Sequence, residues 1–190
     1  RIMASTADMG DSYSLLAEHV RGLIPFDRME IALINADAGS MTRTYVTGTE
    51  VSGWEEETTE PLAGTIVEEA VLSRAPFYTQ AQAQDEVESR LPKLKSGLQA
   101  GLESYLVMPL VSNDEVVGAI TLSAARADAY TDEHAALAER VASLLAGAVA
   151  TDRLRKSNPP TSGEVAALAE IGTIVTSSLD IGEVYGRFAE

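Results

Sequence analysis

The sequence contains no cysteine among its 190 residues. Disulfide bonds, thiolate metal ligands, thiol nucleophiles and thioether-linked cofactors are therefore all excluded. Only two histidines, His19 and His134, could supply an imidazole base. No apolar run approaches the length of a membrane-spanning helix, and no signal-peptide pattern is present.

Basic residues are also scarce, since 14 Lys and Arg stand against 29 Asp and Glu and give a net charge of −15. A surface this acidic repels phosphate groups, so we expect no nucleic-acid partner and no membrane contact by this segment. Hydrophobic residues make up 45% of the chain, the ordinary share for a folded domain with a sizeable core. We expect a cytoplasmic protein.

Motifs for catalysis and for phosphate binding are missing as well. A nucleophilic hydrolase needs a base beside its nucleophile, and His19 and His134 both stand at positions where solvated side chains are expected. The acidic runs at 55–57 and 85–88 have no apolar setting that would perturb their pKa values. No P-loop, dinucleotide-binding fingerprint or calcium loop is present. We predict no catalytic residue, no metal site and no cofactor.

Hydrophobic periodicity predicts an ordered series of helices and strands. Helical spacing of apolar residues predicts helices over 12–23 and 65–74 and from Thr131 onward. Thr65 and Glu68 fit a capping box at the start of the second of these helices. Apolar runs and alternations predict strands over 28–35, 41–48, 76–79, 104–111 and 116–124. The hairpins require antiparallel pairing, and the helices must cover at least one face of the sheet. The prediction is an α+β layered domain.

The two ends of the chain resemble each other. An ungapped offset of 172 residues gives seven identities in seventeen positions. The identical residues are Ile2, Ser5, Asp8, Gly10, Tyr13, Ala17 and Glu18, matched by Ile174, Ser177, Asp180, Gly182, Tyr185, Ala189 and Glu190. Either two amphipathic helices are merely alike, or the chain is a tandem array. The tandem interpretation predicts one domain over 1–155, a linker over 156–163 that contains two prolines, and the lead-in helices of a truncated second unit over 164–190.

Four blocks of sequence carry a resemblance to a known family. They are LLAEHVRGLIPFDRMEIALIN (15–35), GTIVEEAVLSRAPFYT (64–79), SYLVMPLVSNDEVVGAITLS (104–123) and YTDEHAALAERVASLLAGAVA (130–150). In this order and spacing the sequence resembles a GAF domain, the small-ligand sensory module of signalling proteins. The tail LAEIGTIVTSSLDIGEVYGRFAE (168–190) resembles the helix that precedes GAF domains in bacterial multi-sensor kinases.

The resemblance implies a GAF-like central antiparallel sheet of five or six strands with helices on both faces. The terminal helices would cover one face and often build a parallel dimer, and the middle helices and loops would close over a ligand cavity on the other. Bilin photoreceptors and methionine sulfoxide reductases of this family use a cysteine, which this chain lacks. The cyclic-nucleotide signature is present only as the fragment Asn113-Asp114-Glu115, which makes that ligand doubtful.

Six residues are candidates for the walls of a ligand pocket, because such a cavity needs aromatic walls and a few polar anchors. They are Trp54, Phe77, Tyr78, Tyr105, Met108 and Leu110. The alternative is that they fill a core, which we favour for Met108 and Leu110. For Trp54, which stands between glycine and glutamate, we favour a lid or a surface position.

Apolar stripes on the first and last helices are candidates for a dimer interface. The stripes comprise Tyr13, Leu16 and Val20 on the first helix and Leu137, Val141, Leu144 and Ala148 on the last. The spacing of the second stripe suits a coiled-coil seam, and packing onto the sheet would produce the same pattern. We expect a parallel homodimer.

The resemblance favours a non-catalytic sensory or regulatory module. It would bind an unidentified small molecule and transmit the signal through its terminal helices to an output domain such as the histidine kinase of a bacterial two-component system. The output could instead be a cyclic-di-nucleotide enzyme or a transcription regulator. A ligand-free structural dimerisation unit is the main rival, and an enzyme is a third option. A closed cavity with polar anchors would favour the sensor, and a filled interior would favour the structural unit.

Overall fold

The computed structural model describes residues 5–79 and 91–157. The chain divides into two compact units, Arg1–Arg153 and Leu154–Glu190. The predicted second repeat over 164–190 lies outside the described residues. So does the predicted linker, except that its first two residues belong to the last helix, which ends at Ser157.

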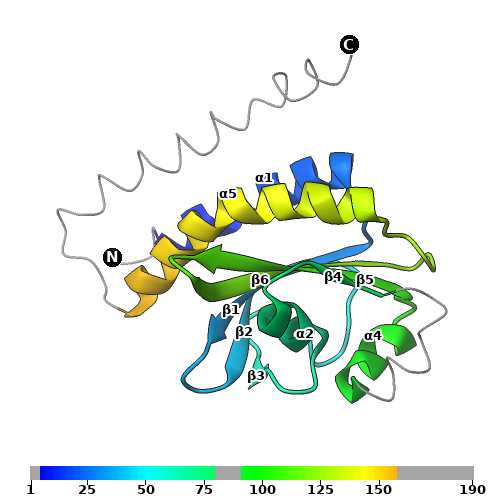
Figure 1. The fold of residues 1–190 in the computed structure, drawn as a ribbon, viewed down its shortest axis with the longest axis horizontal. Coiled ribbons are helices and arrows are strands. Elements are labelled where there is room, and N and C mark those ends of the chain that lie inside the picture. The colour runs from blue at the N-terminus through cyan, green and yellow to red at the C-terminus, as the bar shows by residue number, and fades with distance from the viewer. Residues whose placement is uncertain (1–4, 80–90, 158–190) are drawn as a thin grey trace, which may run out of the picture. The chain divides into compact units, whose positions relative to one another are not determined.

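A six-stranded antiparallel sheet forms the middle layer of the first unit, in the order β3-β2-β1-β6-β5-β4 (Figure 1). The strands are β1 (Arg28–Asn35), β2 (Ser40–Gly48), β3 (Thr59–Pro61), β4 (Phe77–Tyr78), β5 (Ser104–Ser112) and β6 (Glu115–Ala124). The predicted antiparallel sheet is confirmed.

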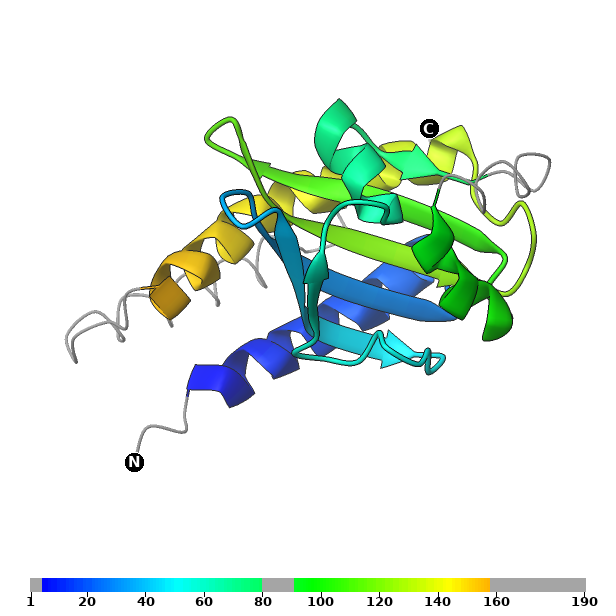
Figure 2. The same cartoon turned by 90° about the horizontal axis from the view of Figure 1, so that it is seen from below.

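Helices cover both faces of this sheet (Figures 1 and 2). The two long helices, α1 (Ser5–Leu23) and α5 (Asp132–Ser157), lie on one face. The short helices α2 (Ile66–Ser73), η2 (Pro92–Leu94) and α4 (Lys95–Gln99) lie on the other. The predicted α+β arrangement, with terminal helices on one side and middle helices on the other, is confirmed.

The sheet separates two hydrophobic cores. The core against α1 and α5, here called the terminal-helix core, includes Val20, Met29, Ile31, Leu106, Ile120 and Leu145. The core beneath α2 and α4, here called the pocket-side core, includes Ile34, Met41, Val67, Leu102 and Val107. Successive side chains of a strand point to opposite faces, so the apolar run of β1 supplies both cores, as a central strand should.

The β5–β6 hairpin turns on two residues with left-handed backbone. Asn113 and Asp114 have φ of 51° and 63°, which is the geometry of a type I′ turn. Asn113 and Asp114 therefore form the turn of this hairpin, and Glu115 begins β6.

Helix α2 begins with the predicted cap. The Thr65 hydroxyl oxygen accepts a hydrogen bond from the Glu68 amide at 3.3 Å, and a Glu68 carboxylate oxygen accepts one from the Gly64 amide at 2.7 Å. These bonds link the first turn of α2 to the residues before it, and the Glu68 amide also donates to the Thr65 carbonyl at 3.2 Å. The cap fixes the start of α2 at the border of the pocket-side core.

Two buried tyrosines differ in how their hydroxyl groups are satisfied. The Tyr105 hydroxyl donates to the Leu102 carbonyl at 3.0 Å, whereas the Tyr130 hydroxyl is buried without a hydrogen-bond partner in the described part of the chain. Burial raises the pKa of both phenols, so neither ionises near neutral pH.

We expect Tyr105→Phe to lower the free energy of unfolding by about 1–2 kcal/mol, because it leaves a buried carbonyl unpaired. Tyr130→Phe should be neutral or stabilising, because it removes a buried polar atom that has no partner. Urea denaturation of the two variants checks the difference. Equal losses in both would contradict it.

Candidate functional site

The pocket-side core contains three buried charged side chains. Arg28, Glu30 and Arg43 are only 2%, 4% and 2% exposed. Arg28 and Glu30 stand two residues apart on β1, and therefore on one face of the sheet. Arg43 lies on β2 opposite Ala32, next to them on the same face. Central strands thus carry charge where an ordinary core would carry aliphatic groups.

These three side chains form ion pairs with one another. A single Glu30 oxygen, Oε2, accepts from Arg28 Nη2 at 3.3 Å and from Arg43 Nε at 3.1 Å. Arg28 also donates to the carbonyls of Thr49 at 2.7 Å and Trp54 at 2.5 Å. The Arg28 Nε atom is buried and has no partner among the described residues.

Trp54 covers the two guanidinium groups. The guanidinium carbons of Arg28 and Arg43 lie 5.8 Å and 5.4 Å from its ring centre, within the range of a cation–π contact. Trp54 is only 8% exposed, so the expectation of a surface position is wrong. Its burial follows from these contacts and from the turn of 51–54, where the Trp54 amide donates to the Val51 carbonyl.

Helix α4 packs its backbone directly on the indole. A Cβ atom at Gly97 would lie 2.9 Å from the Trp54 ring and 2.3 Å from the Tyr105 hydroxyl. Only glycine permits this approach. The tryptophan is therefore held between α4 on one side and the two arginines on the other.

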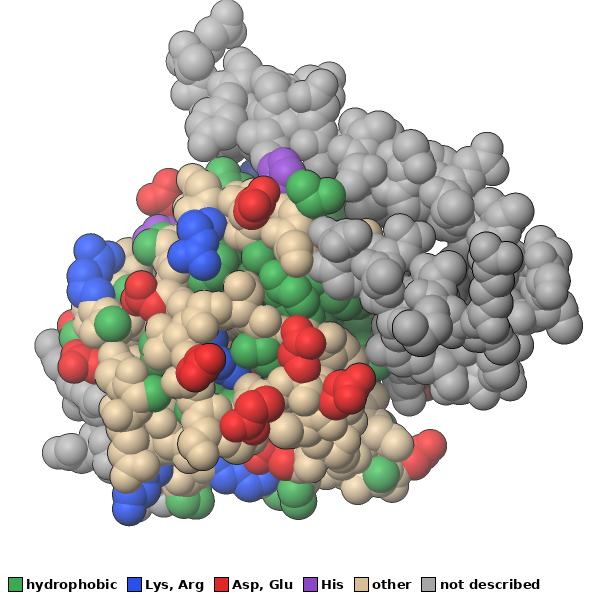
Figure 3. Space-filling view, turned by 180° about the vertical axis from the view of Figure 1, so that it is seen from behind, with side chains coloured by type: hydrophobic (Ala, Val, Ile, Leu, Met, Phe, Trp, Pro, Cys, Tyr) green, Lys and Arg blue, Asp and Glu red, His purple; other side chains and the backbone are tan. Residues whose placement is uncertain are grey.

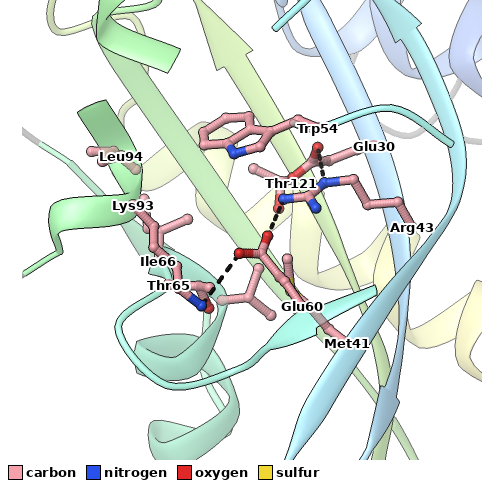
Figure 4. Close-up of a pocket in the computed structure, with 11 residues that line it drawn as sticks. Glu30, Met41, Arg43, Trp54, Glu60, Thr65, Ile66, Lys93, Leu94 and Thr121 are labelled. Atoms are coloured by element: carbon pink, nitrogen blue, oxygen red, sulfur yellow. Dashed lines mark hydrogen bonds and ion pairs between the residues drawn. The ribbon is translucent and has the colours of Figure 1, made fainter. Parts of the chain in front are cut away.

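Two further charged residues extend the network to the surface (Figure 4). Glu60, on the edge strand β3, pairs through Oε1 with Arg43 Nη2 at 2.6 Å and through Oε2 with Lys93 Nζ at 3.3 Å. Lys93 also donates to the Pro61 carbonyl at 2.5 Å. The side chains of Glu60 and Lys93 are 21% and 31% exposed. We call the five residues Arg28, Glu30, Arg43, Glu60 and Lys93 the ionic network.

The network carries an excess of positive charge. Three cationic and two anionic side chains leave a net charge of +1, in a chain whose net charge is −15. Burying ions costs several kcal/mol each, and the attraction between them offsets that cost only in good geometry. Such a cluster is therefore poor evidence for added stability. Because it lies on the face of the sheet that is expected to bind a ligand, it is a candidate binding site.

The network lines a cavity of about 10 Å³, roughly the room that one water molecule needs. Its walls are Glu30, Met41, Arg43, Trp54, Glu60, Thr65, Ile66, Val67, Lys93, Leu94 and Thr121. Side chains therefore fill most of the interior, and the polar ones comprise four charged groups and the two threonines Thr65 and Thr121.

The six predicted pocket residues do not share a face of the sheet. Trp54 and Tyr105 belong to the pocket-side core, and Phe77 packs at its border. Met108, Leu110 and, at the border, Tyr78 belong to the terminal-helix core. Met108 and Leu110 are core residues, the placement favoured from sequence. Of the six, only Trp54 lines the cavity.

Sequence reasoning missed the ionic network. A usable signal was present, because Arg28 and Glu30 occupy alternate positions of the otherwise apolar strand RMEIALIN, and Arg43 occupies an inward position of MTRTYVTG. Charged residues at core-facing positions of strands are rare unless they are paired. Glu60 and Lys93 carry no comparable signal, since both stand in polar segments.

The sequence of this chain matches the model of a known protein family. A family model described as GAF domain matches residues 7–150. The chain belongs to the GAF domain family. GAF domains are generally sensory or regulatory modules that bind small molecules, and they commonly dimerise.

Solved structures with a similar fold come from several kinds of protein. The GAF domain of a two-component sensor histidine kinase from Bacillus halodurans has a TM-score of 0.64 at 16% identity, over 77% of this chain and 96% of that one. The GAF domain of an Acinetobacter phosphoenolpyruvate-protein phosphotransferase has a TM-score of 0.62 at 12% identity, over 80% and 89%. A type II free methionine-R-sulfoxide reductase from Thermoplasma acidophilum has a TM-score of 0.59 at 15% identity, over 76% and 94%.

At these identities the likeness establishes the GAF fold and leaves the activity open, since the neighbours include an enzyme as well as sensor domains. No curated protein shows a significant sequence match to this chain. Within the described residues, no helix is long and apolar enough to cross a membrane.

The two histidines of this GAF domain lie away from the ionic network. His19 Nδ1 lies 2.7 Å from the Leu15 carbonyl on α1, and His134 Nδ1 lies 3.4 Å from the Thr131 hydroxyl at the start of α5. The part of the chain that the structure describes holds no group of three acidic or imidazole side chains placed to bind a metal ion.

The residues predicted for a dimer interface are buried on α1 and partly exposed on α5. Tyr13, Leu16 and Val20 are buried in the terminal-helix core of the single chain, so they are not free for a partner. The residues of α5 that are buried in the terminal-helix core are Ala138, Ala142, Leu145, Ala146 and Val149, and Leu137 and Val141 pack against this core while only partly buried. The predicted stripe lies beside them: Leu137, Val141 and Ala148 are half-buried, and Leu144 is 57% exposed.

Proposed function

We propose that this GAF domain is a non-catalytic sensory module that binds a small molecule at the ionic network and passes the signal through its terminal helices. The observation that carries the proposal is the buried cluster of Arg28, Glu30 and Arg43 on the face beneath α2 and α4. A binding site needs a few fixed polar groups within an apolar wall. The pocket-side core supplies such a wall, and Trp54 and Met41 line the cavity beside the charges.

The sheet offers a short route from this site to the terminal helices. Met29 and Ile31 pack in the terminal-helix core, and each is a chain neighbour of Glu30 on the opposite face of β1. A shift of the β1 backbone at Glu30 therefore moves side chains against α1 and α5. Packed elements of this kind respond by small rotations or slides, which a downstream dimeric output domain such as a histidine kinase could receive.

The proposal is tested by looking for a ligand and for its effect on the helices. Native mass spectrometry of the purified protein would detect a co-purified small molecule, and a panel of anionic, cationic and neutral metabolites would be screened for binding. Hydrogen exchange with and without a binder should change in α5 as well as around the network. Binding with no change in α1 or α5 would contradict transmission through these helices.

A second candidate is a ligand-free structural dimerisation module. The cavity of about 10 Å³ favours it, because side chains occupy most of the space that a ligand would need. Under this alternative no compound in the panel binds, and the ionic network only fixes the packing of β3 and η2. Attachment of a bilin through cysteine, and any other cysteine chemistry, are excluded for either candidate because the chain has no cysteine.

We further propose that the module forms a parallel homodimer through the stripe of α5 that comprises Leu137, Val141, Leu144 and Ala148. Leu144 at 57% and Leu15 at 47% are exposed leucines on the two terminal helices, and a partner chain would bury them. Acidic side chains lie at several places on the face shown in Figure 3, with a number of them close together in its lower middle. Salt should strengthen association, because two copies of a chain of net charge −15 repel each other.

We expect Leu144→Glu to weaken dimerisation at least tenfold and to leave the fold intact, since this side chain lies outside the terminal-helix core. Ala136→Glu is the matched control, because it adds the same charge at another exposed position of α5. Sedimentation gives the dimer constant and circular dichroism reports the fold. A wild-type chain that stays monomeric at millimolar concentration and high salt would remove the dimer from the proposal.

A further inference from the structure

Glu60 occupies the outer end of the ionic network. Each of its carboxylate oxygens holds one cation, Arg43 at 2.6 Å and Lys93 at 3.3 Å. Figure 4 shows this carboxylate lying between the two cations and beneath Trp54. At 21% exposure Glu60 is reached by solvent, whereas Arg43 at 2% is not. The side chain therefore closes the cavity from its solvent-facing side.

The two cations that Glu60 bridges are placed to hold an oxyanion. Arg43 presents a planar guanidinium group that is fixed by Glu30, by the Thr58 hydroxyl at 3.2 Å and by the Trp54 ring. Arginine binds carboxylate and phosphate groups through two or more of its N–H donors. Lys93 contributes a second, more flexible charge from η2. Without the Glu60 carboxylate, these donors would form a positively charged recess that opens to solvent.

We propose that the site binds the oxyanion group of a small molecule, a carboxylate or a phosphate, which replaces the Glu60 carboxylate between Arg43 and Lys93. This inference rests on the proposed sensory function and names its ligand class. Glu60 is the member of the network that leaves, because it lies on the three-residue edge strand β3. Glu30 stays, because it lies on the central strand β1 between two buried arginines.

The charge count of the network supports this exchange. With Glu60 in place the five side chains sum to +1, and with Glu60 turned out to solvent the remaining four sum to +2. A monoanionic ligand restores +1, and a dianionic one brings the sum to zero. A cationic ligand would leave the buried arginines with a larger excess of positive charge, which is costly in a desolvated site.

The exchange also changes the contacts of the segments around the site. Lys93 joins η2 to β3 through Glu60 and through the Pro61 carbonyl. When a ligand takes the place of Glu60, the ion pair between η2 and β3 is replaced by one between η2 and the ligand. The site can thus enlarge beyond 10 Å³ while its buried pairs, Glu30 with Arg28 and Arg43, stay intact.

The experiment uses the only tryptophan of the chain as its reporter. Trp54 lies over Arg43 at 5.4 Å, so its fluorescence responds to a change at this site. The full chain is titrated with acetate, succinate and inorganic phosphate at constant ionic strength, and with acetamide as the neutral isostere of acetate. Acetate, succinate or phosphate should change the signal in a saturable way, and acetamide should not.

Two variants locate the effect. Glu60→Gln should raise the affinity for the binding anion roughly 10- to 100-fold. The Glu60 carboxylate competes with the anion for Arg43 and Lys93 and occupies the site most of the time, and the variant removes this competition. Lys93→Met should lower it at least tenfold. Glu50→Gln and Lys95→Met, at exposed positions outside the network, are the matched controls and should match the wild type. Circular dichroism verifies that each variant is folded.

The outcomes separate the inference from the proposed function. Equal affinities in the wild type, Glu60→Gln and Lys93→Met would overturn the inference, because the anion would then bind elsewhere. Binding of neutral or cationic metabolites, with no anion binding, would overturn it and leave the sensory function standing. If Glu60→Gln and the wild type bind none of the anions and no member of the metabolite panel, both fail, and the structural module is the better account.

Discussion

Replacing Glu30 by glutamine should lower the free energy of unfolding by about 3 kcal/mol, the scale at which a broken buried ion pair destabilises a protein. The substitution keeps the shape of the side chain and removes its charge. Arg28 and Arg43, each 2% exposed, would then lie in the interior without the carboxylate that both of them contact. Neither guanidinium group can lose its proton to relieve the cost, because arginine stays charged in proteins.

Urea denaturation followed by far-ultraviolet circular dichroism measures this loss. Glu50→Gln is the matched control, because Glu50 is exposed, and its change should stay within about 0.5 kcal/mol. A Glu30→Gln variant as stable as the control would mean that water reaches the arginines and that the network is not a desolvated cluster.

A double variant tests whether the cost arises from uncompensated charge. Arg43→Met alone should also be destabilising, because it leaves Glu30 with a single cationic partner. Combined with Glu30→Gln, it should cost less than the sum of the two single changes by about 1–3 kcal/mol. Strict additivity would show that the two side chains contribute independently.

Replacing Gly48 by alanine should cost about 3 kcal/mol or more, because two effects combine there. Gly48 has φ of +94°, and its Cβ would lie 2.0 Å from the Asp27 carbonyl oxygen. Gly48 is the last residue of β2, and Asp27 directly precedes β1 and is tied to Thr49 and Ser123 by backbone hydrogen bonds, so neither backbone can move without disturbing the sheet. Backbone strain and overpacking each contribute about 1–3 kcal/mol.

Gly53 provides the control that separates these effects. It has a similar φ of +84°, and no heavy atom lies within 4 Å of its ideal Cβ position. Gly53→Ala should therefore show the backbone strain alone, and Gly48→Ala the strain plus the clash. Equal losses in the two variants would contradict the role of the close approach. Because Thr49, which follows Gly48, holds Arg28 through its carbonyl, Trp54 fluorescence should also change in Gly48→Ala.

The sequence predicts those helices and strands whose local pattern of apolar, capping and turn residues matches their place in the fold. The two-sided apolar strand 28–35, the cap at Thr65 and the hairpin of 104–124 are all present in the structure. Strand β3 was not predicted, because three residues in a polar, acidic segment carry no periodicity. It exists only through its pairing with the first residues of β2, which is a long-range effect.

The sequence left open which face α5 turns toward the sheet, since the stripe of Leu137, Val141, Leu144 and Ala148 suited either a dimer seam or packing onto the sheet. The fully buried residues of α5 lie one position further along the helix and include the alanines Ala138 and Ala142. Small residues let the helix approach the sheet closely. Gly118 on β6 shows how close the approach is, since its Cβ would lie 3.3 Å from a Val149 methyl group. Volume matching of this kind depends on both surfaces and is invisible in one helix alone.

The burial of Trp54 and the pairing of the charged residues could not be predicted for the same reason, because both depend on contacts between segments that are distant in the sequence. The five charges of the ionic network come from β1, β2, β3 and η2, and no short stretch of sequence contains more than two of them. The sequence could have marked Arg28, Glu30 and Arg43 as unusual strand residues. It could not show that Glu60 and Lys93 complete the set.

The alternation of side chains along β1 has a consequence for how this module can be altered by evolution or by design. Arg28 and Glu30 face the cavity side, whereas Met29 and Ile31 face the terminal helices. Under the proposed function, substitutions at the first pair would change the ligand site, and substitutions at the second pair would change the packing against the terminal helices. Recognition and response would then lie at interleaved positions of a single strand, next to each other in the sequence and on opposite faces of the sheet.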